Sequence, residues 1–288
     1  MADSTEIWDI ASQIGTTAVV AAACRAVEHH RDDSIVSDPY AEPLVEAARL
    51  PFPIPTRPAP DAANWRAMSD LLGTRGRFFD DVLEQAVDDG IRQVVILAAG
   101  LDTRAQRLGW PSGTVVFEIE QPAVLDFKME VLDTLGAAAS CDHRPVGHDL
   151  RGDWAAALDA AGFDRSSPSV WIAEGLLYYL TPAAQQGLLE TVDMLAAPGS
   201  RWATEDDPAF LDRMNDPEAR AASESMGVDL RILLEAGSRP DPESWLLANR
   251  WVVESRRLRT AAAGYGRVLD PLTDRTNGSF VLTSSRKV

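Results

Sequence analysis

Three carboxylates stand at the ends of predicted strands, where they could bind a ligand together. Glu120 ends the run TVVFEIE, Asp149 follows RPVGH, and Glu174 follows SVWIA. In an open parallel sheet, ligands bind beyond the carboxyl ends of the strands, near the point where the strand order reverses. We therefore expect these three side chains to lie along one edge of a sheet and to form part of a binding site.

A glycine turn after the first predicted strand supplies the second part of the pattern. The run VVILAAGLDTR leads from apolar residues to Gly100, which can adopt backbone conformations that other residues avoid. Glu120 follows 20 residues later, the spacing at which a carboxylate accepts hydrogen bonds from a ribose diol. The three glycines of a dinucleotide site and the GxxxxGK[ST] of a phosphate loop are missing. The alternatives are an ordinary tight turn and a solvated carboxylate, and the spacing favours Glu120 over Glu118 as the ligand-binding residue.

Glu174 requires a partner because its strand is expected to be buried, and a buried carboxylate is costly unless it is paired. A structural ion pair is the alternative to a role in ligand binding. Asp149 could instead cap a helix, although Asp153 is better placed to do so. The candidate cations for Glu174 in the preceding predicted helices are Arg75, Arg77 and Arg25.

Strands and helices that would position these residues alternate from residue 94 onward. Short, wholly apolar runs are typical of strands buried on both faces, and their alternation with helices predicts a parallel, doubly wound α/β sheet. Two late strands, the last of them antiparallel, would complete a mostly parallel, seven-stranded, Rossmann-like sheet. The expected helices cover 104–108, 154–161 and 182–195. The expected strands cover 94–100, 114–120, 144–150, 169–175, 200–206, 251–255 and 279–286.

Helices are predicted before the sheet as well. Apolar residues recur at helical spacing over 5–29, and 65–90 is expected to form one or two helices that stop at a glycine. Another helix is expected to start at Ser37-Asp38-Pro39, with an acidic cap and a proline in its first turn.

A proline cluster suggests how the chain is divided. The sequence PFPIPTRPAP at 51–60 predicts an extended connector, because proline forbids helix and removes backbone donors. We expect an N-terminal helical cap at 1–90 and a core at 91–288. An acidic, proline-marked segment at about 207–250 is expected to be a helical lid insertion in that core.

Composition narrows the possible partners and location. The 288 residues are 45% hydrophobic and carry a net charge of −17, so phosphate backbones and anionic membrane surfaces are disfavoured as partners. Two distant cysteines and four histidines lack the spacing of a metal site. The N-terminus MADSTEIWDI is acidic where a signal peptide is basic, and no apolar run could span a bilayer. We expect a cytoplasmic protein.

The longest recognisable segment is RQVVILAAGLDTRAQRLGWPSGTVVFEIEQPAVLDFK (92–128), which is followed by HDLRGDW and AEGLLYYLTP. In this order the motifs resemble the leucine carboxyl methyltransferase superfamily. The resemblance is nearest to its actinobacterial branch of S-adenosylmethionine-dependent methyltransferases and polyketide O-methyltransferases, and it covers roughly 15–200. AAGLDTR followed by FEIEQP is specific, whereas either motif alone is weak. The resemblance implies an enzyme that uses S-adenosyl-L-methionine for direct, in-line transfer of a methyl group to oxygen.

Carried over residue by residue, the resemblance also implies a cofactor site. Arg75 would bind the methionine carboxylate, Glu174 the methionine amino group, and Glu120 the ribose hydroxyls. Further implied residues are Gly100 and Asp102 against the cofactor, Asp149 and Leu150 around the adenine, Arg25 as an additional basic residue, and Tyr179 near the methyl-transfer pocket.

The acceptor implied by the resemblance is a small metabolite of secondary metabolism, polyketide or peptide-derived, methylated on a carboxylate or a hydroxyl. Gln121 replaces an apolar residue of the phosphatase-directed branch, which argues against a protein C-terminal leucine as substrate. A carboxylate, with a pKa of about 4, needs no base, whereas a phenol with a pKa of about 10 does. Because no Ser-His-Asp or Cys-His arrangement is recognisable, we favour carboxyl methylation, with Tyr179 orienting the acceptor. His148 is the candidate base for a hydroxyl acceptor.

Two other functions remain open from the sequence. The chain could bind the cofactor without turnover, or it could be a nicotinamide-dependent oxidoreductase of the Rossmann type. The missing second and third glycines argue against the oxidoreductase. The sequence says nothing about the oligomeric state.

Overall fold

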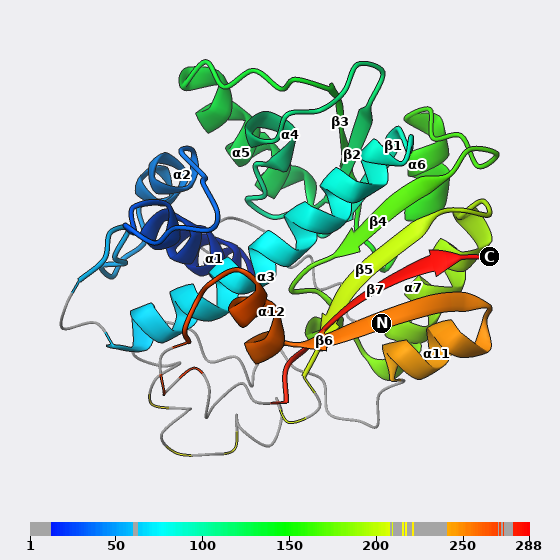
Figure 1. Ribbon diagram of the computed structural model, residues 1–288. Coiled ribbons are helices and arrows are strands. Elements are labelled where there is room, and N and C mark those ends of the chain that lie inside the picture. The colour runs from blue at the N-terminus through cyan, green and yellow to red at the C-terminus, as the bar shows by residue number, and fades with distance from the viewer. Residues whose placement is uncertain are drawn as a thin grey trace, which may run out of the picture.

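In the computed structural model, seven strands form one sheet with helices on both faces (Figure 1). The structure describes residues 13–59, 63–207, 241–269 and 279–288, with single residues at 209, 215, 217, 221, 271 and 273. The strands are β1 (Gln93–Leu97), β2 (Val115–Glu120), β3 (Asp142–Gly147), β4 (Ser169–Ala173), β5 (Arg201–Asp206), β6 (Trp251–Arg257) and β7 (Val281–Lys287). The helices are α1 (Gln13–His29), α2 (Ala41–Ala48), α3 (Ala63–Asp88), α4 (Arg104–Arg107), α5 (Pro122–Thr134), α6 (Trp154–Ala160), the 3₁₀ helix η1 (Leu177–Tyr179), α7 (Pro182–Leu195), α11 (Pro242–Ala248) and α12 (Leu258–Gly264).

The strand order is β3-β2-β1-β4-β5-β7-β6, and it reverses between β1 and β4. Strands β1 to β5 pair in parallel, whereas β7 runs antiparallel to both β5 and β6. This confirms the predicted doubly wound, mostly parallel, seven-stranded sheet. All five residues of β1 are buried, as expected for a central strand covered on both faces.

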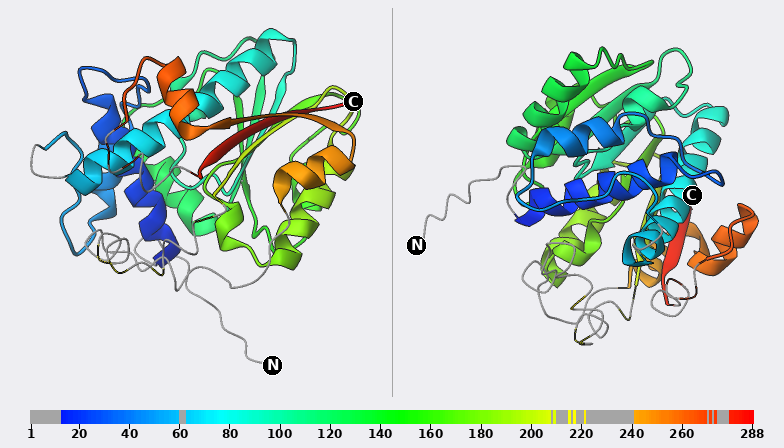
Figure 2. Two further views of the ribbon diagram at one scale, coloured as in Figure 1. Left: turned by 60° about the horizontal axis from the view of Figure 1, so that its bottom comes forward. Right: turned by 90° about the vertical axis from the view of Figure 1, so that its left-hand side faces the viewer.

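Two apolar layers hold the helices against the sheet. On one face, residues of α3 and α12 pack with Val94 and Ile96 of β1. On the other face, residues of α6, α7 and α11 pack with Val95 and Leu97. This alternation along one strand follows from the period of two in strand side chains. Figure 2 shows α3 and α12 on the opposite side of the sheet from α7 and α11.

The start of α2 differs from the prediction. The helix begins at Ala41, not at Ser37-Asp38-Pro39, and its capping position is held by Tyr40, with no side-chain cap. Asp38 is unavailable as a cap because its carboxylate binds Arg25 at 2.9 Å and accepts from the amide of Tyr40. The proline in the first turn is therefore Pro43.

The predicted strands and helices otherwise lie close to their observed positions. The weakest strand prediction, 144–150, is displaced, since β3 ends at Gly147. Residues 63–88 form one helix, α3, and the connector at 51–59 contains neither helix nor strand. Most of the expected lid at 207–250 falls outside the described residues, and α11 is the described helix within it. None of the described helices has the length and apolarity needed to cross a membrane.

Candidate functional site

Glu120 and Gly100 meet at the carboxyl edge of the sheet, on neighbouring strands. The amide of Gly100 donates to Glu120 Oε2 at 2.7 Å, and the amide of Gln121 donates to Oε1 at 2.6 Å. Burial raises the pKa of Glu120, and these two amides oppose the rise. The glycine turn and the carboxylate that follows it by 20 residues are thus hydrogen-bonded to each other at this edge.

The turn at Gly100 is tightly constrained by the N-terminal helices. Gly100 has φ = 51°, and a Cβ atom there would lie 3.3 Å from the Cβ of Ala18 on α1. The next residue, Leu101, is buried in a cluster with apolar residues of α1 and α2. Arg25 donates to the carbonyl of Leu101 at 2.6 Å and to Asp38, so it fastens this turn to α1.

Glu174, directly after β4, binds two arginines. Arg75 Nε lies 2.9 Å from its Oε1, and Arg104 Nη1 lies 2.7 Å from its Oε2. Burial opposes ionisation of Glu174, but Arg104 and Arg75 together lower its pKa. Of the three candidate cations only Arg75 contacts Glu174. Arg77 instead pairs with Asp81 on the outer side of α3, and Arg25 pairs with Asp38, so the prediction of these two arginines as partners of Glu174 was wrong.

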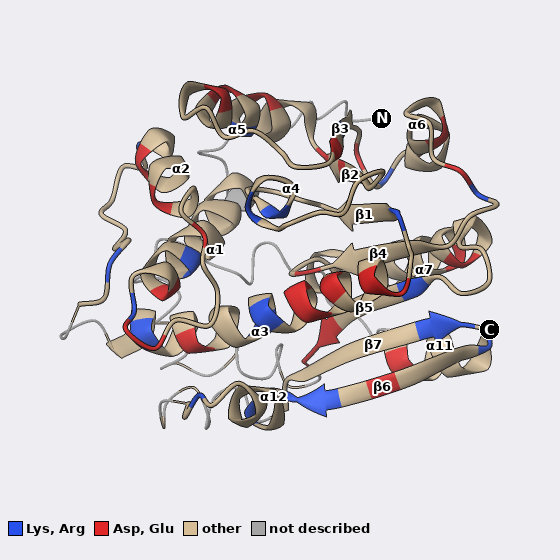
Figure 3. Ribbon diagram, turned by 45° about the horizontal axis from the view of Figure 1, so that its top comes forward, with Lys and Arg blue, Asp and Glu red and all other residues tan. Residues whose placement is uncertain are grey.

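Arg104 is a site residue that the sequence analysis missed. Its guanidinium is almost fully buried, and it also contacts Asp102 at 2.5 Å and Asp80 at 2.6 Å. Although burial raises the pKa of Asp102, Arg104 and its neighbours lower it to about 2. Figure 3 marks acidic residues along α3, the helix of Asp80, and basic residues on α4, the helix of Arg104. This one side chain joins three parts of the fold: the turn after β1, helix α3, and the end of β4.

Glu205, on β5, is a second residue that the sequence analysis missed. Its Oε1 accepts from the amide of Gly175 at 2.5 Å and lies 3.5 Å from Arg75 Nη1. Its Oε2 is buried and has no hydrogen-bond partner among the described residues. Burial raises the pKa of Glu205 to about 7, because Arg75 compensates only in part.

Glu118 does not reach the carboxyl edge of the sheet, because its side chain is buried and pairs with other buried residues. Its side chain is fully buried, with Lys128 Nζ at 2.6 Å and His143 Nε2 at 2.9 Å from Oε2. Burial opposes ionisation, but Lys128 and His143 lower the pKa of Glu118. Lys128 also donates to the carbonyl of Asp102, so this cluster is hydrogen-bonded to the turn that follows β1.

Asp149 and His148 lie beside Glu120, beyond the end of β3. The amide of His148 donates to the carbonyl of Glu120 at 2.9 Å, and the side chain of Gln121 bonds Asp149. The Asp149 carboxylate also accepts from the guanidinium of Arg151, at 2.7 Å and 3.0 Å. His148 Nδ1 lies 2.9 Å from the carbonyl oxygen of Asp149.

Other predicted residues lie at the borders of this edge. Leu150 is half-buried and packs against the apolar layer of α6 and α7. Tyr179, in η1, is hydrogen-bonded to Thr17 of α1, and burial raises its pKa. Asp153 caps α6 by accepting from the amide of Ala156, as predicted. That cap leaves Asp149 available for the edge of the sheet.

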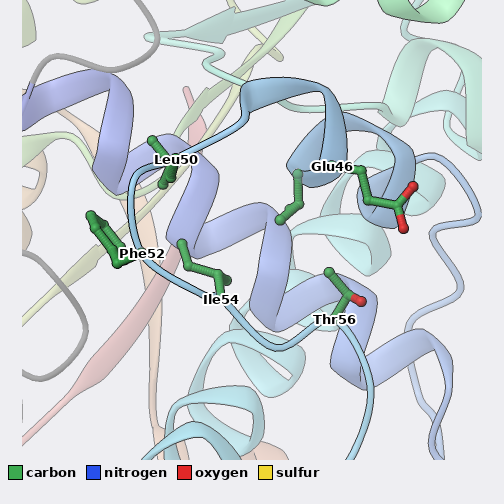
Figure 4. A pocket seen from close by; sticks show the side chains of 6 residues that line it. Glu46, Leu50, Phe52, Ile54 and Thr56 are labelled. Atoms are coloured by element: carbon green, nitrogen blue, oxygen red, sulfur yellow. The ribbon is translucent and has the colours of Figure 1, made fainter.

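A separate pocket of about 250 Å³ lies between α2 and the connector. Figure 4 shows Glu46 of α2, Leu50 just before the connector, and Phe52 and Ile54 of the connector around it. Leu50 and Ile54 also pack on the cluster that contains Leu101. The connector is therefore coupled through packing to the turn that carries Gly100. Among the described residues, no group of three histidine, cysteine or acidic side chains is placed to hold a metal ion.

Comparison with known proteins identifies the relatives of this chain. A model of the leucine carboxyl methyltransferase family matches residues 18–193. A candidate S-adenosyl-L-methionine-dependent methyltransferase of Saccharopolyspora erythraea is 45% identical over 272 residues, covering 94% of each chain. One of Mycolicibacterium vanbaalenii is 45% identical over 296 residues, covering 97% of each. Among solved structures, a candidate methyltransferase from Thermobifida fusca has the same fold, with a TM-score of 0.57, 16% identity and 94% coverage of each chain.

Proposed function

The chain belongs to the leucine carboxyl methyltransferase family, and from that premise we propose that it is an S-adenosyl-L-methionine-dependent O-methyltransferase. The observation that carries the proposal is the row of polar groups along one sheet edge. Glu120 bonds the Gly100 turn on β1, and Glu174 binds Arg75 at the neighbouring tip, where the strand order reverses. Ligands of such sheets bind at this point.

The groups at this edge fit the chemistry of the cofactor. Glu120 is held by two backbone amides and still has lone pairs to accept from ribose hydroxyls. Glu174 and Arg75 offer one anion and one cation for the amino and carboxylate groups of the methionine part. Gly100 has no side chain to block the ligand, and Asp102 is held beside it by Arg104. We place the adenine near Asp149 and Leu150, beside Glu120.

The task of the protein in this reaction is mainly alignment. When bound, S-adenosyl-L-methionine supplies an activated methyl group together with its own neutral leaving group. The chain must hold the acceptor oxygen about 3–3.5 Å from that methyl group and in line with the bond that breaks. The buried ion pairs of Arg75 and Arg104 fix the positions of the cofactor-binding carboxylates before binding, which lowers the cost of ordering the site.

We propose that the acceptor oxygen belongs to a carboxylate of a small metabolite, such as a polyketide or a peptide-derived molecule. A carboxylate is already ionised at neutral pH, so the site needs no base. Tyr179, in the buried segment after Glu174, would orient the acceptor rather than remove a proton from it. The hydrogen bond of its hydroxyl to Thr17 fixes the ring between η1 and α1.

A hydroxyl acceptor is the second candidate, and the geometry of His148 is the observation that favours it. Its Nδ1 contacts a carbonyl oxygen, which can only accept, so Nδ1 carries the proton. The Nε2 of neutral His148 is then the basic nitrogen. A phenol acceptor would need such a base.

One experiment separates the two acceptor classes. The protein is incubated with methyl-labelled cofactor and a metabolite extract, and the labelled product is treated with mild alkali. Carboxyl methylation predicts release of the label as methanol. A label that stays bound, as in an aryl methyl ether, would contradict it and favour the hydroxyl acceptor with His148 as base.

Failure to incorporate any label would favour a homologue that binds the cofactor without turnover. Binding of a nicotinamide dinucleotide in place of S-adenosylhomocysteine would favour an oxidoreductase. The β1 turn, where a single glycine meets one carboxylate, argues against the oxidoreductase.

We further propose that the N-terminal cap at 1–90 and the segment at about 207–250 roof the cofactor and shape the acceptor pocket of the core at 91–288. Support comes from α1, since Ala18 and Arg25 both contact the Gly100 turn. Limited proteolysis with and without S-adenosylhomocysteine tests the proposal. Protection of 1–90 by the ligand is expected, and identical cleavage in both conditions would contradict it.

A further inference from the structure

One guanidinium, that of Arg75, lies between two carboxyl groups from neighbouring strand ends. Its Nε is 2.9 Å from Glu174 Oε1, and its Nη1 is 3.5 Å from Glu205 Oε1. The Glu205 side chain is only 1% exposed, and its Oε2 has no partner among the residues that the structure describes. A buried carboxylate oxygen without a partner is costly, whereas a protonated carboxyl carries no charge to compensate.

The two carboxyl groups are not equivalent. Glu174 has a second cation, Arg104, at 2.7 Å, whereas among the described residues Glu205 has the longer contact to Arg75 and one backbone amide. Of the two, Glu205 is therefore the group that holds a proton near neutral pH. Burial raises the pKa of Glu205 to about 7, in agreement with the geometry.

Two neighbouring carboxylates also favour the protonated state of Glu205. Glu174 after β4 and Asp206 on β5 are negative and oppose its ionisation, and Arg75 of α3 is the compensating cation. Tyr178 and Tyr179 of η1 are neutral there, since burial raises the pKa of both. Taken together, these charged neighbours of Glu205 are net negative, which favours the protonated carboxyl.

We infer that Glu205 is a positioning residue of the cofactor site and must carry a proton for the cofactor to bind. The inference rests on the proposed function, in which Arg75 receives the methionine carboxylate. If Glu205 were ionised, that carboxylate would compete with two protein anions for one guanidinium. With Glu205 neutral, the charge of Arg75 is shared with Glu174 alone, and the Glu205 carboxyl still accepts from Gly175.

A definite pH dependence follows. The incoming carboxylate raises the proton affinity of Glu205 further, so binding near pH 7 takes up a proton. Below pH 7 the free protein is already protonated, and affinity is flat. Above pH 7 the free protein must first gain a proton, so affinity falls by up to about tenfold for each pH unit.

The test is calorimetric titration of the full chain with S-adenosylhomocysteine between pH 6 and pH 8.5, comparing wild type with Glu205→Gln. Glutamine keeps the acceptor for Gly175 and places an amide where the protonated oxygen stands. From pH 7 to pH 8.5, the affinity of wild type should fall about tenfold more than that of the variant. The amino group of the ligand titrates alike in both proteins, so the difference isolates Glu205. Glu84→Gln, on the exposed side of α3, is the matched control and should follow wild type.

A second measurement requires no variant. Titrations of wild type at pH 7 in two buffers of different ionisation enthalpy count the protons exchanged, and uptake of about half a proton is expected. No uptake, or parallel pH profiles of wild type and Glu205→Gln, would overturn the inference while leaving the proposed function intact. Absence of ligand binding by wild type at every pH would overturn the proposed function, and this inference with it.

Discussion

Arg75 is the side chain on which the proposed site most depends, because it joins carboxyl groups from two strand ends. Arg75→Ala should weaken binding of S-adenosylhomocysteine by roughly tenfold to a hundredfold, the equivalent of one charge-assisted hydrogen bond of about 1.5–3 kcal/mol. Arg77→Ala, two residues along the same helix, removes an arginine that pairs outside the site and should leave binding unchanged. Titration calorimetry compares the three proteins. Equal affinity of Arg75→Ala and wild type, with both folded, would remove Arg75 from the site.

The buried carboxylate of Asp102 makes the stability of the folded chain depend on pH. Arg104 and its neighbours lower the pKa of Asp102 from 3.8 to about 2 against the effect of burial. Because its pKa is lowered on folding, ionised Asp102 stabilises the folded state by roughly 2 kcal/mol above pH 4. This contribution is lost as the pH falls toward 2. Asp102→Asn should therefore be less stable than wild type by about this amount at pH 7, and the two should converge near pH 2. Denaturant unfolding at a series of pH values measures the difference, and a constant gap would contradict the assignment.

For single residues, the sequence predicted those that can be recognised because they follow an apolar strand. Glu120 and Glu174 follow apolar runs and were identified as strand-end carboxylates. The same rule applied to SRWATED would have found Glu205. Arg104 could not be found in this way, because its partners on α3, on β4 and in the β1 turn meet only in the folded chain.

Among the elements, the turn between β1 and α4 is closely constrained by its neighbours. Gly100 has φ = 51° and lies against Ala18, so alanine there faces both backbone strain of about 1–2 kcal/mol and a close contact. Gly100→Ala should lower the melting temperature and weaken binding of S-adenosylhomocysteine.

Gly187 supplies the control for that substitution. It lies within α7, and nothing would touch an added Cβ. Gly187→Ala should raise stability by about 0.5–1 kcal/mol and leave binding unchanged. Thermal unfolding and calorimetry report both effects, and a Gly100→Ala protein as stable and as tightly binding as wild type would refute the role of the turn.

The parallel sheet and the positions of its central strands were predictable because buried parallel strands are short and largely apolar. The boundaries that failed are those where tertiary contacts override local signals. Asp38 resembles a helix cap in the sequence, but Arg25 holds its carboxylate. The strand at 142–147 is partly exposed at the sheet edge, so its apolar signal is weak.

At the scale of the whole molecule, a buried ion pair joins helix α1 to the segment after α12, which is far from it in the sequence. Arg267, after α12, binds both oxygens of Glu28 on α1 at 2.8 Å and 2.9 Å, and both side chains are essentially inaccessible to solvent. Removal of Arg267 leaves Glu28 with only the longer contact to Arg31, at 3.7 Å, among the described cations, so Arg267→Ala should lower the free energy of unfolding by about 3 kcal/mol. Arg256→Ala, at an exposed pair 3.7 Å long, should cost less than about 1 kcal/mol. Urea unfolding of both variants tests this contrast, and equal losses would contradict it.

We expect the carboxyl edge formed by Gly100, Glu120, Arg75 and Glu174 to bind S-adenosyl-L-methionine. Calorimetric titration of the wild-type protein with S-adenosylhomocysteine measures this binding, and about 100 µM protein is enough to detect typical metabolite affinities. We expect saturable binding at one site per chain and no binding of a nicotinamide dinucleotide. Absence of heat with S-adenosylhomocysteine, or binding of the dinucleotide in its place, would overturn the assignment of this edge.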